Sequence, residues 1–221
     1  KVLQNKNNLK LDIKKFKYGL NKLNLNKKRK EILDFGCGFG DFLDQAKKKH
    51  WKVNGTELNK FCLKVLKKKR INILNVDDLK RNEKLFDAIT MWTVLEHLAE
   101  PDKILKLLIK KLRKNGKFLF NFPNINSLSA KILHEKCSMF SGEQHINFFS
   151  PKTITKYLNN LGLKVIFLET IISDLGTVQN YLNYDHPYLG NFRKSELKFL
   201  SPDFIHKNLL GYTILCIAKK K

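Results

Sequence analysis

The 221-residue sequence predicts an α/β fold built on a doubly wound, mostly parallel sheet. From residue 31 onward, short apolar runs alternate with stretches of helical periodicity, which is the pattern of a parallel sheet covered by helices. A glycine-rich loop follows the first of these runs, as expected where a strand turns into a helix beside a ligand. The length suits one compact domain that buries a core without help from disulfides or metals.

The core elements follow one another in a regular order. The apolar runs predict strands at 31–35, 52–56, 71–76, 86–92 and 117–122. The periodic stretches between them predict helices at 42–50, 60–69 and 102–112. Ahead of this core, scattered apolar positions in a polar, lysine-rich segment at 1–30 predict one or two amphipathic helices.

The regular alternation stops after Pro123. An irregular stretch at 124–150 precedes a predicted helix at 151–161, for which Ser150 is a suitable N-cap. Gly162 ends that helix. Two further strands are predicted at 163–169 and 212–218, and the segment at 171–210 between them is expected to run over the surface of the single domain 31–221.

The loop Asp34-Phe35-Gly36-Cys37-Gly38-Phe39-Gly40 carries the clearest chemical signal. Glycines let a backbone turn sharply and approach a ligand closely. A dinucleotide-binding loop would have a small residue three positions after Gly38, where this chain has Asp41. The glycines instead recur at every second position, with the acid Asp34 two residues before the first.

Glu57 is a second, independent feature, because it follows the next predicted strand, where a carboxylate can accept both hydroxyls of a ribose. Taken singly, Asp34 also fits a turn former, and Glu57 fits an exposed charge at a strand end. Their joint order with the glycines favours a nucleoside-binding site.

On these residues the chain resembles the class I methyltransferases that depend on S-adenosylmethionine (SAM), over roughly 31–168. The run 86–89, the residues Val94-Leu95-Glu96-His97 and the segment 116–120 look like the branch that includes ubiquinone-pathway and sugar methyltransferases. The resemblance implies a Rossmann-like sheet of seven strands in the order 3-2-1-4-5-7-6, with an antiparallel C-terminal strand. It also implies SAM as cofactor.

The resemblance further implies roles for particular residues. The loop, with Phe35 and Cys37, would hold the methionine part of SAM, and Glu57 would hold the ribose. Leu58 would pack on the adenine, and Asp77 or Asp78, with Asp78 slightly favoured, would bind the adenine amine. The alternative for this acidic pair is a helix N-cap. Trp92 and Thr93 would line the side of the sulfonium.

Transfer to a hydroxyl acceptor requires a base, and two histidines qualify by their positions. His145, with Glu143 to orient it, lies in the segment 124–150, which together with 171–210 is expected to cover the acceptor. His97 is the second candidate base. For Glu96 and His97, however, hydrogen bonding to the loop backbone at the start of a helix is favoured over catalysis.

The segment 171–210 is rich in aromatic and polar residues, namely Tyr181, Tyr184, Asp185, His186, Pro187, Tyr188 and Phe192. These residues would either stack on a flat or sugar-like acceptor or pack the segment against the rest of the domain. Packing is slightly favoured.

Composition limits the function classes. The net charge is +23, but only five of the 43 Lys and Arg residues are arginines, which favours compositional bias over nucleic-acid binding. The cysteines are far apart and lie in no metal-ligand pattern, so neither a disulfide framework nor a metal site is indicated. The sequence has no stretch of roughly 20 apolar residues, and a cytoplasmic protein is expected.

The sequence therefore favours an enzyme that methylates an oxygen or nitrogen of a small molecule, such as a sugar or a lipid-linked metabolite. The alternatives are an RNA methyltransferase and a non-catalytic protein that keeps the SAM-binding fold.

Overall fold

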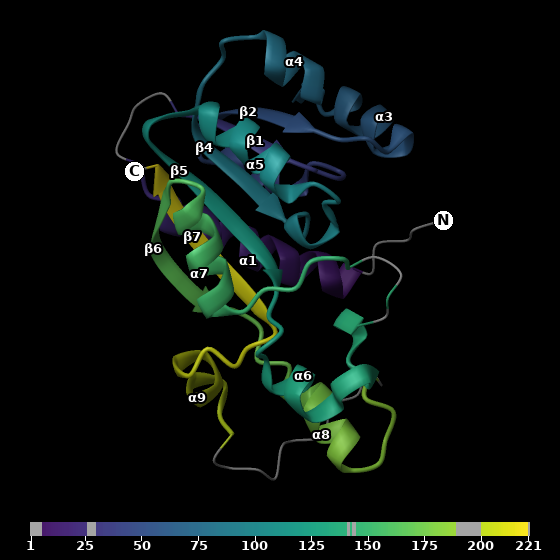
Figure 1. The fold of residues 1–221 in the computed structure, drawn as a ribbon. Helices are drawn as coiled ribbons and strands as arrows, with labels where there is room; N and C mark the ends of the chain where they lie inside the picture. Colours follow the sequence, from purple (N-terminus) through teal and green to yellow (C-terminus); the bar gives the residue numbers. More distant parts are fainter. Residues whose placement is uncertain (1–5, 26–29, 141, 143–144, 189–199, 221) are drawn as a thin grey trace.

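The computed structural model describes residues 6–25, 30–140, 142, 145–188 and 200–220, and these form a central sheet with helices on both faces (Figure 1). The strands are β1 (Lys30–Phe35), β2 (Trp51–Thr56), β3 (Asn72–Ile73), β4 (Phe86–Trp92), β5 (Leu112–Pro123), β6 (Leu163–Thr170) and β7 (Thr213–Lys220). The helices are α1 (Lys6–Leu23), α2 (Asp41–Lys48), α3 (Lys60–Lys68), α4 (Val76–Arg81), α5 (Pro101–Lys110), α6 (Leu128–Leu133), α7 (Pro151–Asn160), α8 (Leu175–Leu182) and α9 (Pro202–Lys207).

The strand order β3-β2-β1-β4-β5-β7-β6 confirms the expected sheet. The pairs from β3 to β5 are parallel, and β7 runs antiparallel to both β5 and β6. The two inner strands β1 and β4 are almost wholly buried, as expected for a parallel sheet covered on both faces.

Two apolar layers hold the helices to the sheet. One layer packs α4, α5 and α7 against one face, with Leu79, Leu105 and Leu158 fully buried. The other layer packs α1, α2 and α3 against the opposite face, with Leu23 and Leu43 fully buried. The N-terminal helix is therefore part of the core packing.

The structure departs from the prediction at the third strand. A strand was expected over 71–76, but β3 contains two residues, because Asn75 caps α4. Asn75 Oδ1 accepts a hydrogen bond from the Asp78 amide, and the Asp78 carboxylate accepts one from the Asn75 amide, which is a capping box. Asn75, rather than either acid, is thus the N-cap of this helix.

The predicted helix start at Ser150 is confirmed, since Ser150 Oγ accepts a hydrogen bond from the Thr153 amide. The stretch 124–150 is less irregular than expected, because it contains α6 and two short 3-10 helices, Leu133 being buried there. In Figure 1, α6 and α8 lie side by side beyond the end of the sheet, and they share a small apolar cluster that includes Met139 and Val178.

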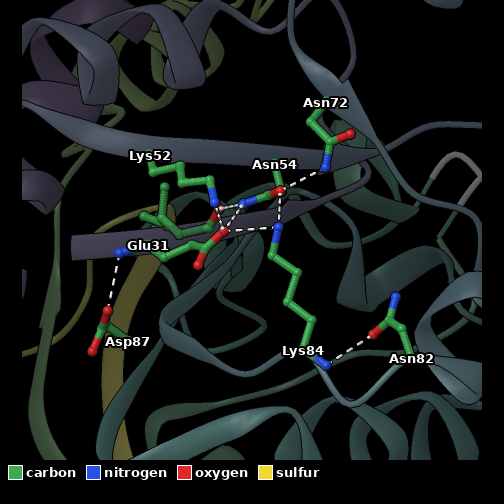
Figure 2. Close-up of polar contacts among 8 residues, drawn as sticks. Glu31, Lys52, Asn54, Asn72, Asn82, Lys84 and Asp87 are labelled. Carbon is green, nitrogen blue, oxygen red and sulfur yellow. Dashed lines mark hydrogen bonds and ion pairs between the residues drawn. The ribbon is translucent and has the colours of Figure 1, made fainter. Parts of the chain in front are cut away.

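A polar cluster surrounds Asn54 of β2 (Figure 2). The buried Asn54 side chain donates to Glu31 Oε1 and to the Ile32 carbonyl, and it accepts from Asn72 and Lys84. Burial opposes ionisation of Glu31, but hydrogen bonds from Lys84 and Asn54 outweigh it and hold its pKa below the usual value. This cluster joins β1, β2 and β3.

Among the described residues, no helix combines the length and the apolar character needed to cross a membrane.

Candidate functional site

The glycine loop lies where β1 ends, and its backbone requires glycine. Gly36, Gly38 and Gly40 have φ values of 74°, 52° and 78°, a region that L side chains rarely adopt. The Gly36 amide donates to Thr56 Oγ1 at 3.0 Å, and the Cys37 amide donates to the Thr56 carbonyl at 2.9 Å. These bonds hold the loop against the end of β2.

Glu57 closes over this loop. Its Oε2 accepts a hydrogen bond from the Gly38 amide at 2.8 Å. Its Oε1 accepts from the amides of Leu58 and Asn59 at 2.7 and 2.8 Å. Because each carboxylate oxygen can accept two hydrogen bonds, Oε2 keeps one free acceptor site, and it would have two if the Gly38 amide moved away.

Asp34 lies at the base of the loop and is 2% exposed. Thr90 Oγ1 donates to Asp34 Oδ1 at 2.6 Å. Burial, with a smaller contribution from the charge of Glu57, raises the pKa of Asp34 to about 8, even though the bond from Thr90 acts in the opposite direction. Burial also raises the pKa of the neighbouring Cys37 thiol, so this thiol stays protonated at neutral pH.

A cavity of about 430 Å³ opens above these residues. It is lined by Asp12, Lys15, Phe16, Asp34, Gly36, Cys37, Gly38, Phe39, Asp41, Phe42, Trp92 and Thr93. The carboxyl ends of β1 and β4 therefore meet at one cavity, as expected for ligand sites in open parallel sheets.

Helix α1 supplies one wall of the cavity, which the sequence pattern did not predict. Lys15 Nζ pairs with Asp12 Oδ1 at 2.8 Å, and the ring of Phe16 packs edge-on against Trp92 at 4.9 Å between centroids. A Cβ on Gly19 would lie 2.7 Å from the Trp92 ring, so the helix approaches β4 as closely as a glycine permits. The amphipathic pattern of 1–30 signalled a packed helix but not what it would line.

Trp92 and Thr93, proposed from the family resemblance to line the sulfonium side, both line the cavity. The Trp92 Nε1 atom is buried without a hydrogen-bond partner among the described residues. Thr93 has a φ of 52°, and its amide donates to the Asn121 carbonyl at 2.8 Å. A ligand with a hydrogen-bond acceptor would satisfy the indole of Trp92.

The residues proposed for the adenine lie at the ends of β2 and β3. Leu58 is 91% exposed, so its side chain is free to pack against a ligand. The Asp77 side chain pairs with Lys80 at 3.0 Å, while Asp78 is engaged in the capping box. Asp77 is the more exposed of the two and Asp78 is held by Asn75, so the structure does not single out Asp78.

A second group of polar side chains lies beside the cavity, at the loop after β4. The rings of His97 and His145 lie 4.9 Å apart between centroids. Glu96 is 2% exposed, and neither of its carboxylate oxygens has a hydrogen-bond partner among the described residues. Burial raises the pKa of Glu96 to about 7, against the opposing effects of its own backbone amide and of the charges of His97 and Lys15. Glu143 lies outside the described residues.

The aromatic residues of 171–210 act at least partly as packing groups. Tyr181 packs against the apolar cluster of α6 and α8, and the Tyr188 hydroxyl accepts a hydrogen bond from the Ser138 amide at 2.6 Å. Tyr184 is 99% exposed, and Phe192 lies outside the described residues.

Comparison with known proteins identifies the family. Residues 12–168 match a family model described as a methyltransferase domain. The chain belongs to this methyltransferase family. The match begins inside α1 and ends in β6, so it includes the cavity and every residue proposed to bind SAM.

Individual relatives agree with this assignment. An uncharacterized protein of Methanocaldococcus jannaschii is 28% identical over 149 residues, which are 66% of this chain and 71% of that protein. A ubiquinone biosynthesis O-methyltransferase of Coxiella burnetii is 31% identical over 108 residues, but the match covers 45% of this chain and 46% of that enzyme. The crystal structure of a SAM-dependent methyltransferase from Archaeoglobus fulgidus superposes with a TM-score of 0.67 at 21% identity, covering 96% and 94% of the two chains.

The protein is thus a SAM-dependent methyltransferase, and the cavity fits that cofactor. Its lining includes the carboxyl group of Asp34, the glycine loop and Trp92, whose buried indole N–H has no hydrogen-bond partner among the described residues. A Cβ on Gly36 would lie 2.7 Å from Val94 Cγ2, so the loop has no room for a side chain at that position.

Proposed function

We propose that this methyltransferase transfers the methyl group of SAM to an oxygen or nitrogen atom of a small molecule with an apolar part, such as a lipid-linked or sugar-bearing metabolite. The observation that carries this proposal is a second cavity, of about 640 Å³, that shares Asp12 and Lys15 with the first. A substrate in the second cavity would therefore lie next to the proposed cofactor site.

The lining of the second cavity suggests the character of the acceptor. Leu11, Ile171 and Ile172 supply apolar surface, and Leu11 and Ile172 are 64% and 43% exposed. Glu169 and His206 supply polar groups at the same cavity, where His206 Nδ1 lies 3.0 Å from Thr170 Oγ1. This combination suits a molecule with an apolar body and a few polar groups.

SAM supplies an activated methyl group, and the chain has to align the acceptor, exclude water and accept a proton. Under this proposal Glu57 holds the ribose, Asp34 and the glycine loop hold the methionine part, and Trp92 and Thr93 face the reacting side. The candidate bases are His97, in the loop after β4, and His145, whose ring lies beside it, although neither is among the residues that line the two cavities.

The experiment is an acceptor screen with methyl-labelled SAM, in which amphipathic phenols and lipid-linked metabolites, nucleotide sugars and bulk RNA are compared. We expect label in the small-molecule pools. Label confined to RNA would refute the proposal in favour of the competing RNA methyltransferase, whose substrate would explain the charge of +23. No SAM binding in calorimetry at millimolar cofactor would favour a non-catalytic protein instead.

A matched pair of variants tests the second cavity. Ile172→Lys is expected to raise the KM for an amphipathic acceptor at least tenfold while the Kd for SAM stays unchanged. Ile166 is exposed to a similar extent, 46%, but does not line the cavity, so Ile166→Lys is the control. Equal KM values in the two variants would place the acceptor elsewhere.

A further inference from the structure

We propose that Glu96, His97 and His145 form a binding site for one divalent transition-metal ion. One ligand atom from each of these three side chains lies within 4.8 Å of the other two. Two imidazoles and one carboxylate form a ligand set suited to Zn²⁺, Fe²⁺, Mn²⁺ or Co²⁺. Sequence spacing did not reveal this group, because His145 comes from a distant segment of the chain.

The state of Glu96 is the first argument. Its side chain is 2% exposed, and neither carboxylate oxygen makes a hydrogen bond of normal geometry with the described residues, although its own backbone amide lies near enough to interact with it. A buried carboxylate without partners costs several kcal/mol unless it is protonated or paired with a cation. His97 Nε2 lies 4.0 Å from Glu96 Oε1, too far for a hydrogen bond but close enough for both atoms to share one ion.

The orientation of His145 is the second argument. Its Nδ1 lies 3.0 Å from the Met139 carbonyl oxygen, which can only accept a hydrogen bond, so Nδ1 carries the proton. The lone pair is then on Nε2. A histidine that donates one ring N–H to a backbone carbonyl and offers the other nitrogen is the usual arrangement of a metal ligand.

The backbone holds the two segments together without a metal. The amides of Ile146 and Asn147 donate to the Glu96 carbonyl at 2.9 and 3.0 Å. The Asn147 side chain donates to the Leu98 carbonyl at 2.7 Å. The three ligands are therefore positioned by hydrogen bonds of their neighbours, as a preorganised site requires.

Binding needs only a small closure of the side chains. The ligand atoms of a tetrahedral ion lie roughly 3.4 Å apart for bonds of about 2.1 Å, so a pair at the 4.8 Å limit would close by about 1.4 Å. Rotation of exposed side chains achieves such a shift, and His97 is 35% exposed.

The location suggests what the ion would do. Lys15, whose charge acts on Glu96, lines both the cofactor cavity and the second cavity. Three protein ligands leave at least one coordination position open, and an acceptor oxygen bound there would lose its proton more readily. This catalytic consequence rests on the proposed function, whereas binding of the ion does not.

The test uses the full chain without an affinity tag, stripped of metal by a chelator. Titration with Co²⁺, followed by visible absorption, and with Zn²⁺, followed by calorimetry, is expected to show one ion per chain at micromolar or lower Kd. Glu96→Gln and His145→Ala are each expected to weaken binding at least tenfold. His134→Ala, at an exposed histidine outside the group, is the control and is expected to bind as the unmodified protein does.

Circular dichroism in metal-free buffer verifies that each variant is folded, and Glu96→Gln keeps the volume of the side chain. Absence of stoichiometric binding by the unmodified chain, or binding that survives both substitutions, would overturn the proposal. The Kd for SAM is measured separately in metal-free buffer, since failure there would reject the proposed function and leave the metal site standing.

Discussion

Replacing Glu57 with glutamine is expected to loosen the glycine loop and to weaken SAM binding. The carboxylate accepts hydrogen bonds from three backbone amides, those of Gly38, Leu58 and Asn59. Glutamine has one carbonyl oxygen, which can keep the two bonds of Leu58 and Asn59, but its NH₂ group would face the Gly38 amide, donor against donor. An unsatisfied, partly buried amide costs about 1–3 kcal/mol, which is the expected loss in unfolding free energy.

The same substitution removes the acceptor that we propose for the ribose. The loss of a hydrogen bond to a charged group costs about 1.5–3 kcal/mol, which corresponds to a Kd for SAM that is roughly 10 to 150 times larger. Glu83→Gln, at an exposed glutamate, removes the same charge outside the site and is the control.

Calorimetry with SAM and urea unfolding, both at neutral pH, provide the two readouts. An unchanged Kd in the Glu57→Gln variant would refute the role of Glu57 in ribose binding. An unchanged unfolding free energy would refute the hydrogen-bond argument for the loop, independently of the cofactor.

Three further predictions concern the sheet and the loop. Because burial raises the pKa of Asp34 to about 8, the folded state retains a proton that the unfolded chain releases near pH 4, so stability falls by up to about 1.4 kcal/mol per pH unit between pH 4 and 8. Asp34→Asn is expected to remove this slope in urea unfolding at pH 5, 6.5 and 8, and parallel pH profiles would contradict the argument. Gly36→Ala is expected to lower the unfolding free energy by about 1–2 kcal/mol through backbone strain alone, and to abolish the rise in melting temperature that SAM induces. Adding Val94→Ala should recover only the part of the stability loss that is due to the 2.7 Å contact with Val94. Full recovery of stability would show that the positive φ of Gly36 is unimportant. Asn54→Ala breaks four side-chain hydrogen bonds, including that from Lys84. We expect it to lower the unfolding free energy by about 2–4 kcal/mol without changing the Kd for SAM. A loss below about 0.5 kcal/mol in thermal or urea unfolding would contradict the stabilising role of Asn54.

Much of the sheet was predictable because its signals are local. The strand at 86–92 coincides with β4, and the start of α7 coincides with the predicted cap, since apolar runs and capping residues act over a few neighbouring positions. The expectation for 71–76 failed for a local reason as well, because the capping box of Asn75 and Asp78 ends the extended chain early. The order of the strands followed from the family resemblance rather than from periodicity.

Some residues of the candidate site could likewise be predicted from local sequence, and others could not. The residues proposed to bind SAM at 34–40 lie in one loop, and the sequence alone brought them together with Glu57 through spacing. Only the tertiary structure showed that Lys15 and Phe16 form a wall of the cavity. The sequence pattern of an amphipathic helix does not indicate which cavity the helix will line.

What the sequence by itself determined is the loop chemistry around Asp34, the alternation of strands and helices, and the absence of a cysteine-based metal pattern. Only the tertiary structure brought Glu96 and His97 beside His145, since the hydrogen bonds that join the two segments link residues 49 or more positions apart, such as the Asn147 side chain and the Leu98 carbonyl. Local propensity acts over one or two helical turns, whereas contacts between distant segments depend on how the whole sheet packs.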